Sequence, residues 1–384
     1  IKCTIFFLAI ILLGCQSNDK TSQDSPESES WENRFFVLDM TNGDTGLKDF
    51  SDHFFTNFPH KDPTLGDVVY DKSRWLHDDL IQDKGEEGLQ AYTKFRDEET
   101  GYDSYRFTSK TFFNLNKETS KILFVFKGSF PSANGMWPAW WLNGSNEAPW
   151  IYKDSIPALD DEALNRHSGV GNFYDTPSSV NSPDWPNSGE IDIIENINGD
   201  NHIHNTIHTC PQMCDSEWNN DGLRVNCANA KPGDVNPGCS GSLYDIDAVE
   251  GTFACIWEKA SVKFYYWGTD EVVREAGGPM SSQPEPKSWE KKYLKNSVQL
   301  FETNEECGPL HNPWQCRNCE ESTSCTFRNM KMIFNTTLCG SWAGNTFDDT
   351  PEAFENCQQF IRNEGKAGID NQFATIEYVS AVKL

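Results

Sequence analysis

The sequence predicts an all-β protein, a sandwich or jelly roll of two antiparallel sheets with long surface loops. Strand-like runs recur along the 384 residues, and 19 prolines and 27 glycines punctuate the gaps between them. Helical periodicity is scarce, and no repeat of a solenoid or propeller is present. Hydrophobic residues make up 37 % and aromatic residues 13 %, which is too apolar for a disordered chain.

The expected strands are short and several of them alternate. In 261–267 the apolar side chains of Val262, Phe264 and Tyr266 share one face, and the last run places Ile376, Tyr378, Val382 and Leu384 on one face. Two short helices are expected, at Ser155–Arg166 and Glu352–Asn363. The strand-like runs are Tyr105–Thr111, Lys121–Phe126, Glu190–Ile194, Ile203–Thr209, Phe253–Glu258, Ser261–Trp267, Lys331–Phe334 and Thr375–Leu384.

The N-terminal segment is expected to be a targeting signal and not part of the folded domain. Residues 1–17 combine a lysine, an apolar stretch and small or polar residues, as in a secretory signal peptide. The apolar run Thr4–Gly14 is about half of the ~20 residues that a membrane span needs. Leu12–Cys15 also resembles a lipoprotein box, so lipid anchoring through Cys15 is the alternative. Residues 18–30 form a flexible polar spacer, and 31–384 are expected to be a single domain.

Net charge and aromatic content indicate which kinds of partner the chain can bind. The formal net charge of −26 argues against a nucleic-acid partner, because phosphate binding needs an excess of Lys and Arg. The 13 tryptophans suit flat surfaces for sugar rings, and equally a large aromatic core. Nothing indicates a stable oligomer, so we expect a monomer.

Thirteen cysteines indicate disulfides in a secreted chain. Cys3 and Cys15 lie in the leader, and the others, an odd number, all lie beyond residue 209. Cys255 is the candidate for a free thiol, because its neighbours read as a buried strand. The Cys316–Cys319 pair, with other cysteines nearby, is also compatible with zinc, but secretion favours disulfides.

Three carboxylates on one strand carry the chemistry. In Ser188–Glu195 the isoleucines mark a buried face, and Glu190 and Asp192 share the opposite face. Glu195 is out of phase by one residue, and a β-bulge would return it to the face of the other two. Such a row repels itself, so one carboxyl should keep its proton. Glycosidic cleavage needs carboxyls in two protonation states, a nucleophile and a proton donor.

The same carboxylates leave other interpretations open. A solvated acidic edge or a calcium site would use the same residue types, and the sequence does not indicate which metal, if any, is present. His202, His204 and His208 on one strand face would suit zinc. We expect no metal or cofactor in the reaction, because the neighbouring carboxylates already account for the site.

At this point the motifs resemble glycoside hydrolase family 16, in the form with a β-bulge. The segment Glu190–Glu195 resembles the family signature E-x-D-x-x-E. In the family's order along the chain, similar segments are Asp62–Gly66, Tyr105–Ser109, Met136–Trp141, Trp185–Gly189, Asn205–Thr209 and Cys339–Gly344.

The resemblance implies a concanavalin A-like β-jelly roll and endo-hydrolysis of β-1,3- or mixed β-1,3/1,4-glucan with retention. By position, Glu190 is the nucleophile and Glu195 the general acid/base, and Asp192 between them would orient or share a proton with the nucleophile. Retention needs carboxyls about 5–5.5 Å apart, which side chains leaning together from one strand face can reach. The family also implies a disulfide between Cys339 and Cys357.

Substrate contacts follow from the same resemblance. Trp141, Trp185 and Trp342 would stack on sugar rings, Arg106 would hydrogen-bond hydroxyls, and His208 would hydrogen-bond near the point of cleavage. Trp137 and Trp140 are expected in the core, because alternation sends neighbouring positions to opposite faces.

Two segments depart from the family pattern and put the exact substrate in doubt. Gly144–Asp184 reads as an added loop near the cleft, and the Cys307–Cys325 insert is also extra. Two alternatives to a glucanase remain. One is a glucan-binding recognition protein, in which catalytic carboxylates are lost. The other is a relative that acts as a transglycosylase or on galactan.

Overall fold

The computed structural model describes residues 34–42, 46–56, 60–62, 64–70, 80–97, 101–144, 189–200, 202–208, 216–218, 224–225, 239–240, 249–258, 261–271, 273–274, 277–300, 327, 329–363 and 365–384. The predicted signal peptide, spacer and helix Ser155–Arg166, residues 145–184 of the inserted loop, Trp185 and the cysteines at 210, 214, 227 and 307–325 lie outside these residues. Residues Arg34–Leu384 form one compact unit.

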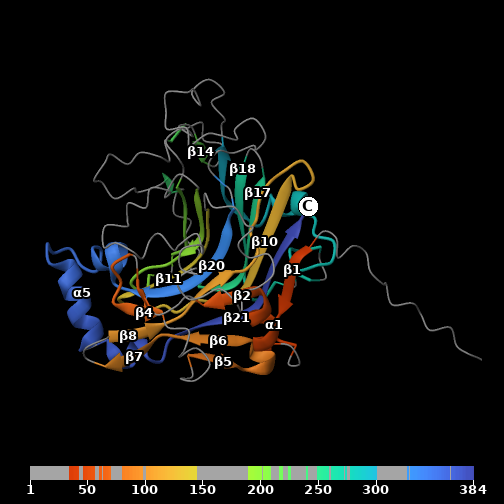
Figure 1. Cartoon of the computed structure of the whole chain (residues 1–384). Helices are drawn as coiled ribbons and strands as arrows, with labels where there is room; N and C mark the ends of the chain where they lie inside the picture. Colours follow the sequence, from red (N-terminus) through yellow and green to blue (C-terminus); the bar gives the residue numbers. More distant parts are fainter. Residues whose placement is uncertain are drawn as a thin grey trace, which may run out of the picture. The chain divides into compact units, whose positions relative to one another are not determined.

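Two large antiparallel sheets dominate the described residues, as the sequence predicted (Figure 1). In spatial order the larger sheet is β15 (Arg224–Val225), β14 (Ser216–Trp218), β19 (Leu294–Leu300), β18 (Ser261–Trp267), β17 (Glu250–Glu258), β10 (Lys121–Ser129), β21 (Phe373–Lys383), β6 (Leu89–Tyr92) and β5 (Ile81–Asp83), with β1 (Arg34–Asp39) also paired to β21. The second sheet is β16 (Cys239–Ser240), β13 (His204–His208), β12 (Glu190–Glu195), β11 (Met136–Asn143), β20 (Lys331–Leu338), β9 (Arg106–Ser109) and β2 (Phe54–Thr56).

Smaller elements lie around these sheets. The helices of the described residues are α1 (Gly46–His53), α4 (Pro286–Trp289), α5 (Ala353–Arg362) and α6 (Lys366–Ile369), with a 3₁₀ turn at Gly85–Glu87 and a π-helical turn at Gly340–Gly344. A third sheet comprises β3 (His60–Lys61), β4 (Val68–Tyr70), β8 (Gly101–Ser104) and β7 (Lys94–Asp97). Figure 1 shows α5 beside this third sheet, where Tyr102 of β8 and Ile361 of α5 belong to one apolar cluster. Among the described residues, no helix combines the length and apolar character that crossing a membrane requires.

The main core lies between the two large sheets. Phe126 of β10 packs on Trp140 of β11, with ring centroids 5.6 Å apart, and on Phe334 of β20 at 5.4 Å. All three side chains are buried. Burying aromatic side chains of this size contributes a large apolar area, so this layer fixes the two sheets against each other.

Most of the expected strands form, and the helix expected at Glu352–Asn363 is present as α5. The run Tyr105–Thr111 forms as the shorter strand β9, Arg106–Ser109. In β18 the alternation is as predicted, since Val262 and Phe264 are in the main core.

The predicted common face of the last strand is wrong. A register shift between β10 and β21 leaves Glu377 as an extra residue, since Lys127 pairs with Tyr378 and Gly128 with Ile376. One extra residue inverts the alternation. Ile376 therefore points into the main core, whereas Tyr378 and Val382 belong to a cluster on the other face of the sheet.

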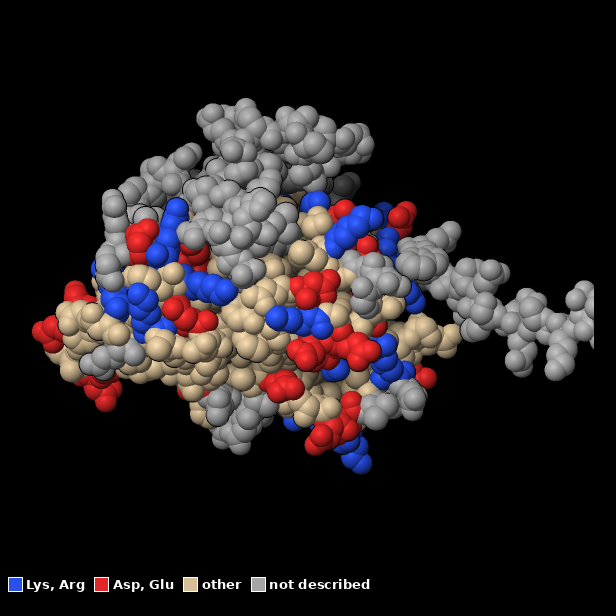
Figure 2. Space-filling model, turned by 90° about the horizontal axis from the view of Figure 1, so that it is seen from below, with Lys and Arg blue, Asp and Glu red and all other residues tan. Residues whose placement is uncertain are grey.

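The outer face of the larger sheet is covered in part by residues 273–274 and 277–293. Trp289 of α4 packs edge-on against Trp267 of β18, at 5.1 Å between centroids, and both are buried. Elsewhere the surface carries charges of both signs. Figure 2 shows Lys and Arg side chains interspersed with Asp and Glu over the face that it draws.

The implied disulfide and the expected free thiol are both confirmed. Cys339 is bonded to Cys357 of α5, 18 residues along the chain. Cys255 of β17 is buried and unbonded in the core between the sheets. The disulfide therefore ties α5 to the start of the turn that carries Trp342.

Removing this disulfide by Cys339→Ala with Cys357→Ala is expected to lower the free energy of unfolding by about 3 kcal/mol, because the closed loop restricts the unfolded chain. Urea unfolding of the oxidised wild type and of the double variant measures the difference. Cys339→Ala alone, which removes the same bond and leaves the other cysteines as they are, is the control and should unfold at a midpoint close to that of the double variant. Equal midpoints for oxidised wild type and variant would contradict the expectation.

Candidate active site

The carboxylates of β12 lie on one face of the second sheet, with the predicted β-bulge between them. Asp192 pairs with Trp141 of β11, and Glu195 pairs with Ala139, so Ile193 and Ile194 together oppose Trp140 alone. The pairing with β13 shifts at the same place. The isoleucines are buried in the main core. The bulge therefore turns Glu195 to the face of Glu190 and Asp192 while the apolar residues stay inside.

His208 of β13 faces the first two carboxylates. It pairs with Glu190 across the strands, and its Nε2 lies 3.6 Å from Glu190 Oε1 and 3.5 Å from Asp192 Oδ2. The three side chains are 12 %, 14 % and 4 % exposed for His208, Glu190 and Asp192 respectively. This is the neighbourhood that the sequence predicted for His208.

Asp192 and Glu195 are buried so deeply that their ionised forms are disfavoured. Burial raises the pKa of Asp192 well above its ordinary value. Burial and the nearby charge of Asp192 raise the pKa of Glu195 as well, although Trp137 partly opposes this. The direction agrees with the expectation that one carboxyl of the row keeps its proton.

Trp137 lies at the site and not in the core, so the expectation for this residue is wrong. Its indole Nε1 donates a hydrogen bond to Glu195 Oε1 at 3.1 Å, whereas Trp140 is fully buried between the sheets. Positions 137 and 140 differ by three, so period-two alternation places them on opposite faces. The same parity groups Trp137 with Trp141, a signal that was present in the sequence.

Trp141 of β11 and Arg106 of β9 lie on the other side of β12 from His208 of β13. Arg106 is buried on β9, and its guanidinium carbon lies 5.1 Å from the centre of the Trp141 ring. Its Nε and Nη2 are buried without a hydrogen-bond partner among the described residues. Buried donors of this kind are costly unless something supplies an acceptor, such as a hydroxyl of a bound sugar.

A hydrogen-bond chain that sequence reasoning missed fixes the Trp141 ring. Trp141 Nε1 donates to Asn335 Oδ1 at 2.7 Å. Asn335 Nδ2 lies 3.4 Å from the Tyr70 hydroxyl, which donates to Asp62 Oδ2 at 2.6 Å. Asp62 belongs to a segment of the family resemblance, but no sequence pattern links it to Asn335 on a strand so distant along the chain.

Trp342 is brought to the Glu195 end of the row. Its ring lies 5.5 Å from that of Trp137, at an interplanar angle of 89°. Trp185 lies outside the described residues, so of the three predicted stacking tryptophans the structure locates Trp141 and Trp342.

Glu190, Asp192 and His208 could also hold a cation. Their ligand atoms all lie within 4.8 Å of one another, and an imidazole with two carboxylates suits a borderline ion such as zinc. The three-histidine arrangement does not form, because the His204 ring packs on Trp342 at 5.0 Å. A cation at this place would occupy the predicted nucleophile, so the arrangement serves nucleophilic catalysis only without one.

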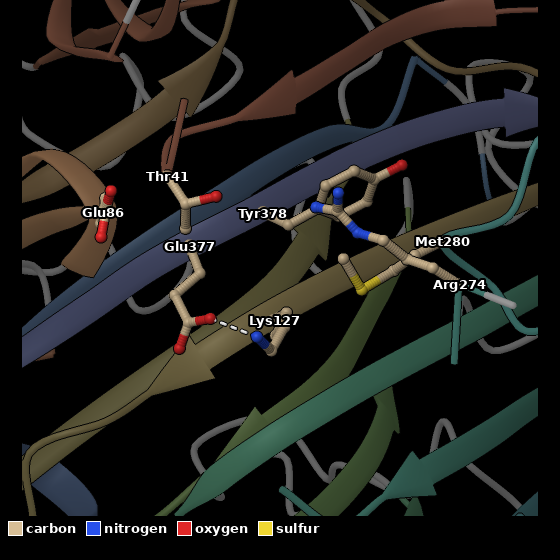
Figure 3. A pocket seen from close by; sticks show the side chains of 7 residues that line it. All are labelled: Thr41, Glu86, Lys127, Arg274, Met280, Glu377 and Tyr378. Carbon is tan, nitrogen blue, oxygen red and sulfur yellow. Dashed lines mark hydrogen bonds and ion pairs between the residues drawn. The ribbon is translucent and has the colours of Figure 1, made fainter. Parts of the chain in front are cut away.

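A pocket of about 460 Å³ on the larger sheet has a different character. Figure 3 shows Lys127 of β10 paired with Glu377 of β21, beside Arg274 and Tyr378. Arg274 Nη2 lies 2.6 Å from Asp39 Oδ2. Both cations are thus neutralised by carboxylates, and the pocket lacks the buried acid that the β12 face offers. Its lining consists of Thr41, Glu86, Lys127, Arg274, Met280, Glu377 and Tyr378.

Comparison with known proteins identifies the family of the chain. The family model for the XgeA-like catalytic domain of glycoside hydrolase family 16 matches residues 179–381, more than half of the chain. An endo-1,3(4)-beta-glucanase of Arthroderma benhamiae is 25 % identical over 224 residues, which are 54 % of this chain and 42 % of that protein. The endo-1,3(4)-beta-glucanase xgeA of Emericella nidulans is 28 % identical over 178 residues, 44 % of this chain and 24 % of that protein. The chain spans less than half the length of these relatives.

Solved structures confirm the jelly-roll fold. An elongating family 16 beta-1,3-glucosyltransferase superposes with a TM-score of 0.59 at 18 % identity, over 91 % of this chain and 98 % of that one. Laminarinase 16A of Phanerochaete chrysosporium, crystallised with beta-glucans in donor and acceptor sites, gives 0.58 at 18 % identity, over 91 % and 99 %. By its family model, its motifs and its fold, the chain belongs to glycoside hydrolase family 16.

Proposed function

We propose that the chain is an endo-acting, retaining glycoside hydrolase that cleaves β-1,3-glucan, mixed β-1,3/1,4-glucan or both by double displacement. The observation that carries the proposal is the row of carboxylates on one face of β12, with Glu190 beside His208 and Glu195 buried against Trp137. Related proteins named endo-1,3(4)-beta-glucanases support the substrate class.

The two glutamates differ in surroundings as the two roles require. Glu195 is 8 % exposed and burial raises its pKa, so it keeps the proton that the leaving oxygen needs. Glu190 would attack the anomeric carbon, forming a glycosyl–enzyme ester while the glycosidic bond breaks. Glu195, now ionised, would remove a proton from water, which then cleaves the ester. Asp192, between them and also disfavouring its charge, would share a proton with the nucleophile.

The aromatic side chains would bind the glucan on either side of this centre. Trp141 and Trp342, together with Trp185, would stack on glucosyl rings, and Arg106 would donate to hydroxyls from its unfilled Nε and Nη2. His208, within reach of Glu190 and Asp192, would hydrogen-bond near the cleavage point.

The proposal also covers the location, the domain organisation and the oligomeric state of the protein. We propose a secreted monomer in which residues 31–384 form one catalytic domain behind a signal peptide and spacer. Lipid anchoring through Cys15 is the alternative form at the cell surface. The polymeric β-glucan is the expected partner.

Product analysis on laminarin, lichenan and agarose tests the function. Short oligosaccharides released early from laminarin or lichenan are expected, because an endo-enzyme cuts internal bonds. Products longer than the laminarin or lichenan chains supplied would instead indicate a transglycosylase. Release of sugars from agarose alone would indicate a galactan hydrolase. Binding to laminarin without cleavage would identify a recognition protein.

Trp137→Phe is expected to extend activity to higher pH. The indole N–H stabilises ionised Glu195, so its loss raises the pKa of that carboxyl further. Because Glu195 must be protonated for the first step, the basic limb of the pH profile of kcat/KM should move upward. Trp141→Phe is the matched control, since its N–H serves Asn335, and it should leave that limb in place. A basic limb that stays or moves down in Trp137→Phe would contradict the assignment.

A further inference from the structure

His204 is a partly buried histidine beside the site, and the proposed reaction does not use it. It lies on β13 directly opposite Glu195, so the two side chains are on the same face of the sheet. Its side chain is 13 % exposed, and its Nε2 lies 3.5 Å from Asp200 Oδ2. Burial lowers the pKa of His204, although the neighbouring Asp200 carboxylate partly opposes this.

Asp200 is itself fixed by the residue that follows Glu195. The Asn196 amide is fully buried and its Nδ2 donates to Asp200 Oδ1 at 2.9 Å. The same Nδ2 lies 3.0 Å from the His202 carbonyl oxygen. The turn between β12 and β13 therefore holds the Asp200 carboxylate where it can meet His204.

The His204 ring packs against the ring of Trp342. The two rings are 5.0 Å apart at an interplanar angle of 78°, an edge-to-face contact. The Trp342 ring meets Trp137 edge-to-face on another side, and Trp137 donates to Glu195. The contacts thus close a circuit from Glu195 through Asn196, Asp200, His204, Trp342 and Trp137 back to Glu195.

The backbone of the Trp342 turn is anchored independently of these rings. Asn198 Nδ2 donates to the Ala343 carbonyl oxygen at 2.9 Å, and Cys339 is bonded to α5. With the backbone fixed and the ring half-buried, the direction of the indole depends on the side chains that stand against it.

From this geometry we propose that His204, packed edge-to-face on Trp342, is a positioning residue that holds Trp342 as the glucan-binding platform beside Glu195. His204 does not touch the reacting atoms in this role. Its loss frees the Trp342 ring, and the binding energy that the ring gives to the sugar falls equally in ground and transition states. The inference rests on the proposed glucan hydrolysis for its kinetic consequence only.

Steady-state kinetics on laminarin distinguish positioning from general packing. His204→Ala is expected to raise KM about fivefold with kcat within about twofold of wild type, because uniform binding is lost. His204→Phe keeps a flat ring against Trp342 and should restore KM to within about twofold of wild type. His53→Ala is the matched control and should leave KM unchanged. His53 of α1 is also partly buried, and its ring packs on that of Phe36 with centroids 5.3 Å apart.

Crystal structures of the same unliganded variants give a readout that needs no activity. The Trp342 ring should leave its position in His204→Ala and keep it in His204→Phe. A Trp342 ring that stays in place in His204→Ala, an unchanged KM in that variant, or a His204→Phe as impaired as His204→Ala would overturn the proposal. If the wild type cleaves no β-glucan, the proposed function fails, and the position of Trp342 in the crystals still decides this inference.

Discussion

Glu190→Gln is expected to abolish hydrolysis of laminarin, and Glu195→Gln to reduce it strongly. Losing a nucleophile removes the covalent route entirely, so a fall in kcat on the order of 10⁵-fold or more is expected for Glu190→Gln. Losing the acid/base should cost about 10²–10⁴-fold in Glu195→Gln, because proton transfer contributes that much. Reducing-sugar release from laminarin, at saturating substrate, measures both.

The stability of Glu195→Gln separates a catalytic loss from a folding loss. The pKa of Glu195 is raised in the folded protein, so the wild type is fully stable below the ordinary value of 4.5 and loses stability as pH rises through the folded pKa. Glutamine carries no charge, so the variant should gain on the wild type in urea midpoint as pH rises above about 4.5 and match it below. Loss of activity together with loss of the native circular dichroism spectrum would leave the catalytic assignment unsupported.

The carboxylate row was predictable because two local patterns coincide in a few residues. Isoleucines at 191, 193 and 194 can be buried together only if one residue is extra, and the bulge that absorbs it also aligns Glu195. The alternation of β18 and the helix α5 were predictable for the same reason, since each depends on a pattern within one short segment.

What escaped prediction depends on contacts between segments far apart in sequence. The bulge at Glu377 is visible only in the pairing with β10, and it reverses which side of β21 is inside. Asn335 becomes part of the site because β20 lies beside β11 and brings its amide to Trp141. His204 comes within 3.5 Å of Asp200 through a turn that the buried Asn196 amide fixes. Trp137 differs, since parity with Trp141 would have placed it correctly.

The identity of the attacking glutamate is tested by rescue with azide. In Glu190→Gly the nucleophile is gone and a small anion fits in its place, while Glu195 can still protonate the leaving group. Azide should then form a C1–N bond from the vacated side as the activated aryl β-glucoside loses its aglycone. One inversion yields the α-glucosyl azide. The anomer is read from the proton NMR spectrum of the product.

With the same aryl β-glucoside, Glu195→Gly is expected to give the other anomer of the azide. Here Glu190 attacks first and an activated leaving group departs without protonation, so a glycosyl–enzyme ester with α configuration accumulates. Azide, which needs no general base, then displaces the ester with a second inversion and gives the β-glucosyl azide. If Glu190→Gly gave the β-glucosyl azide and Glu195→Gly the α-glucosyl azide, Glu195 would be the nucleophile and Glu190 the acid/base. An α-configured first product from the wild type would exclude retention altogether, because two displacements at one carbon restore the β configuration with which the substrate began.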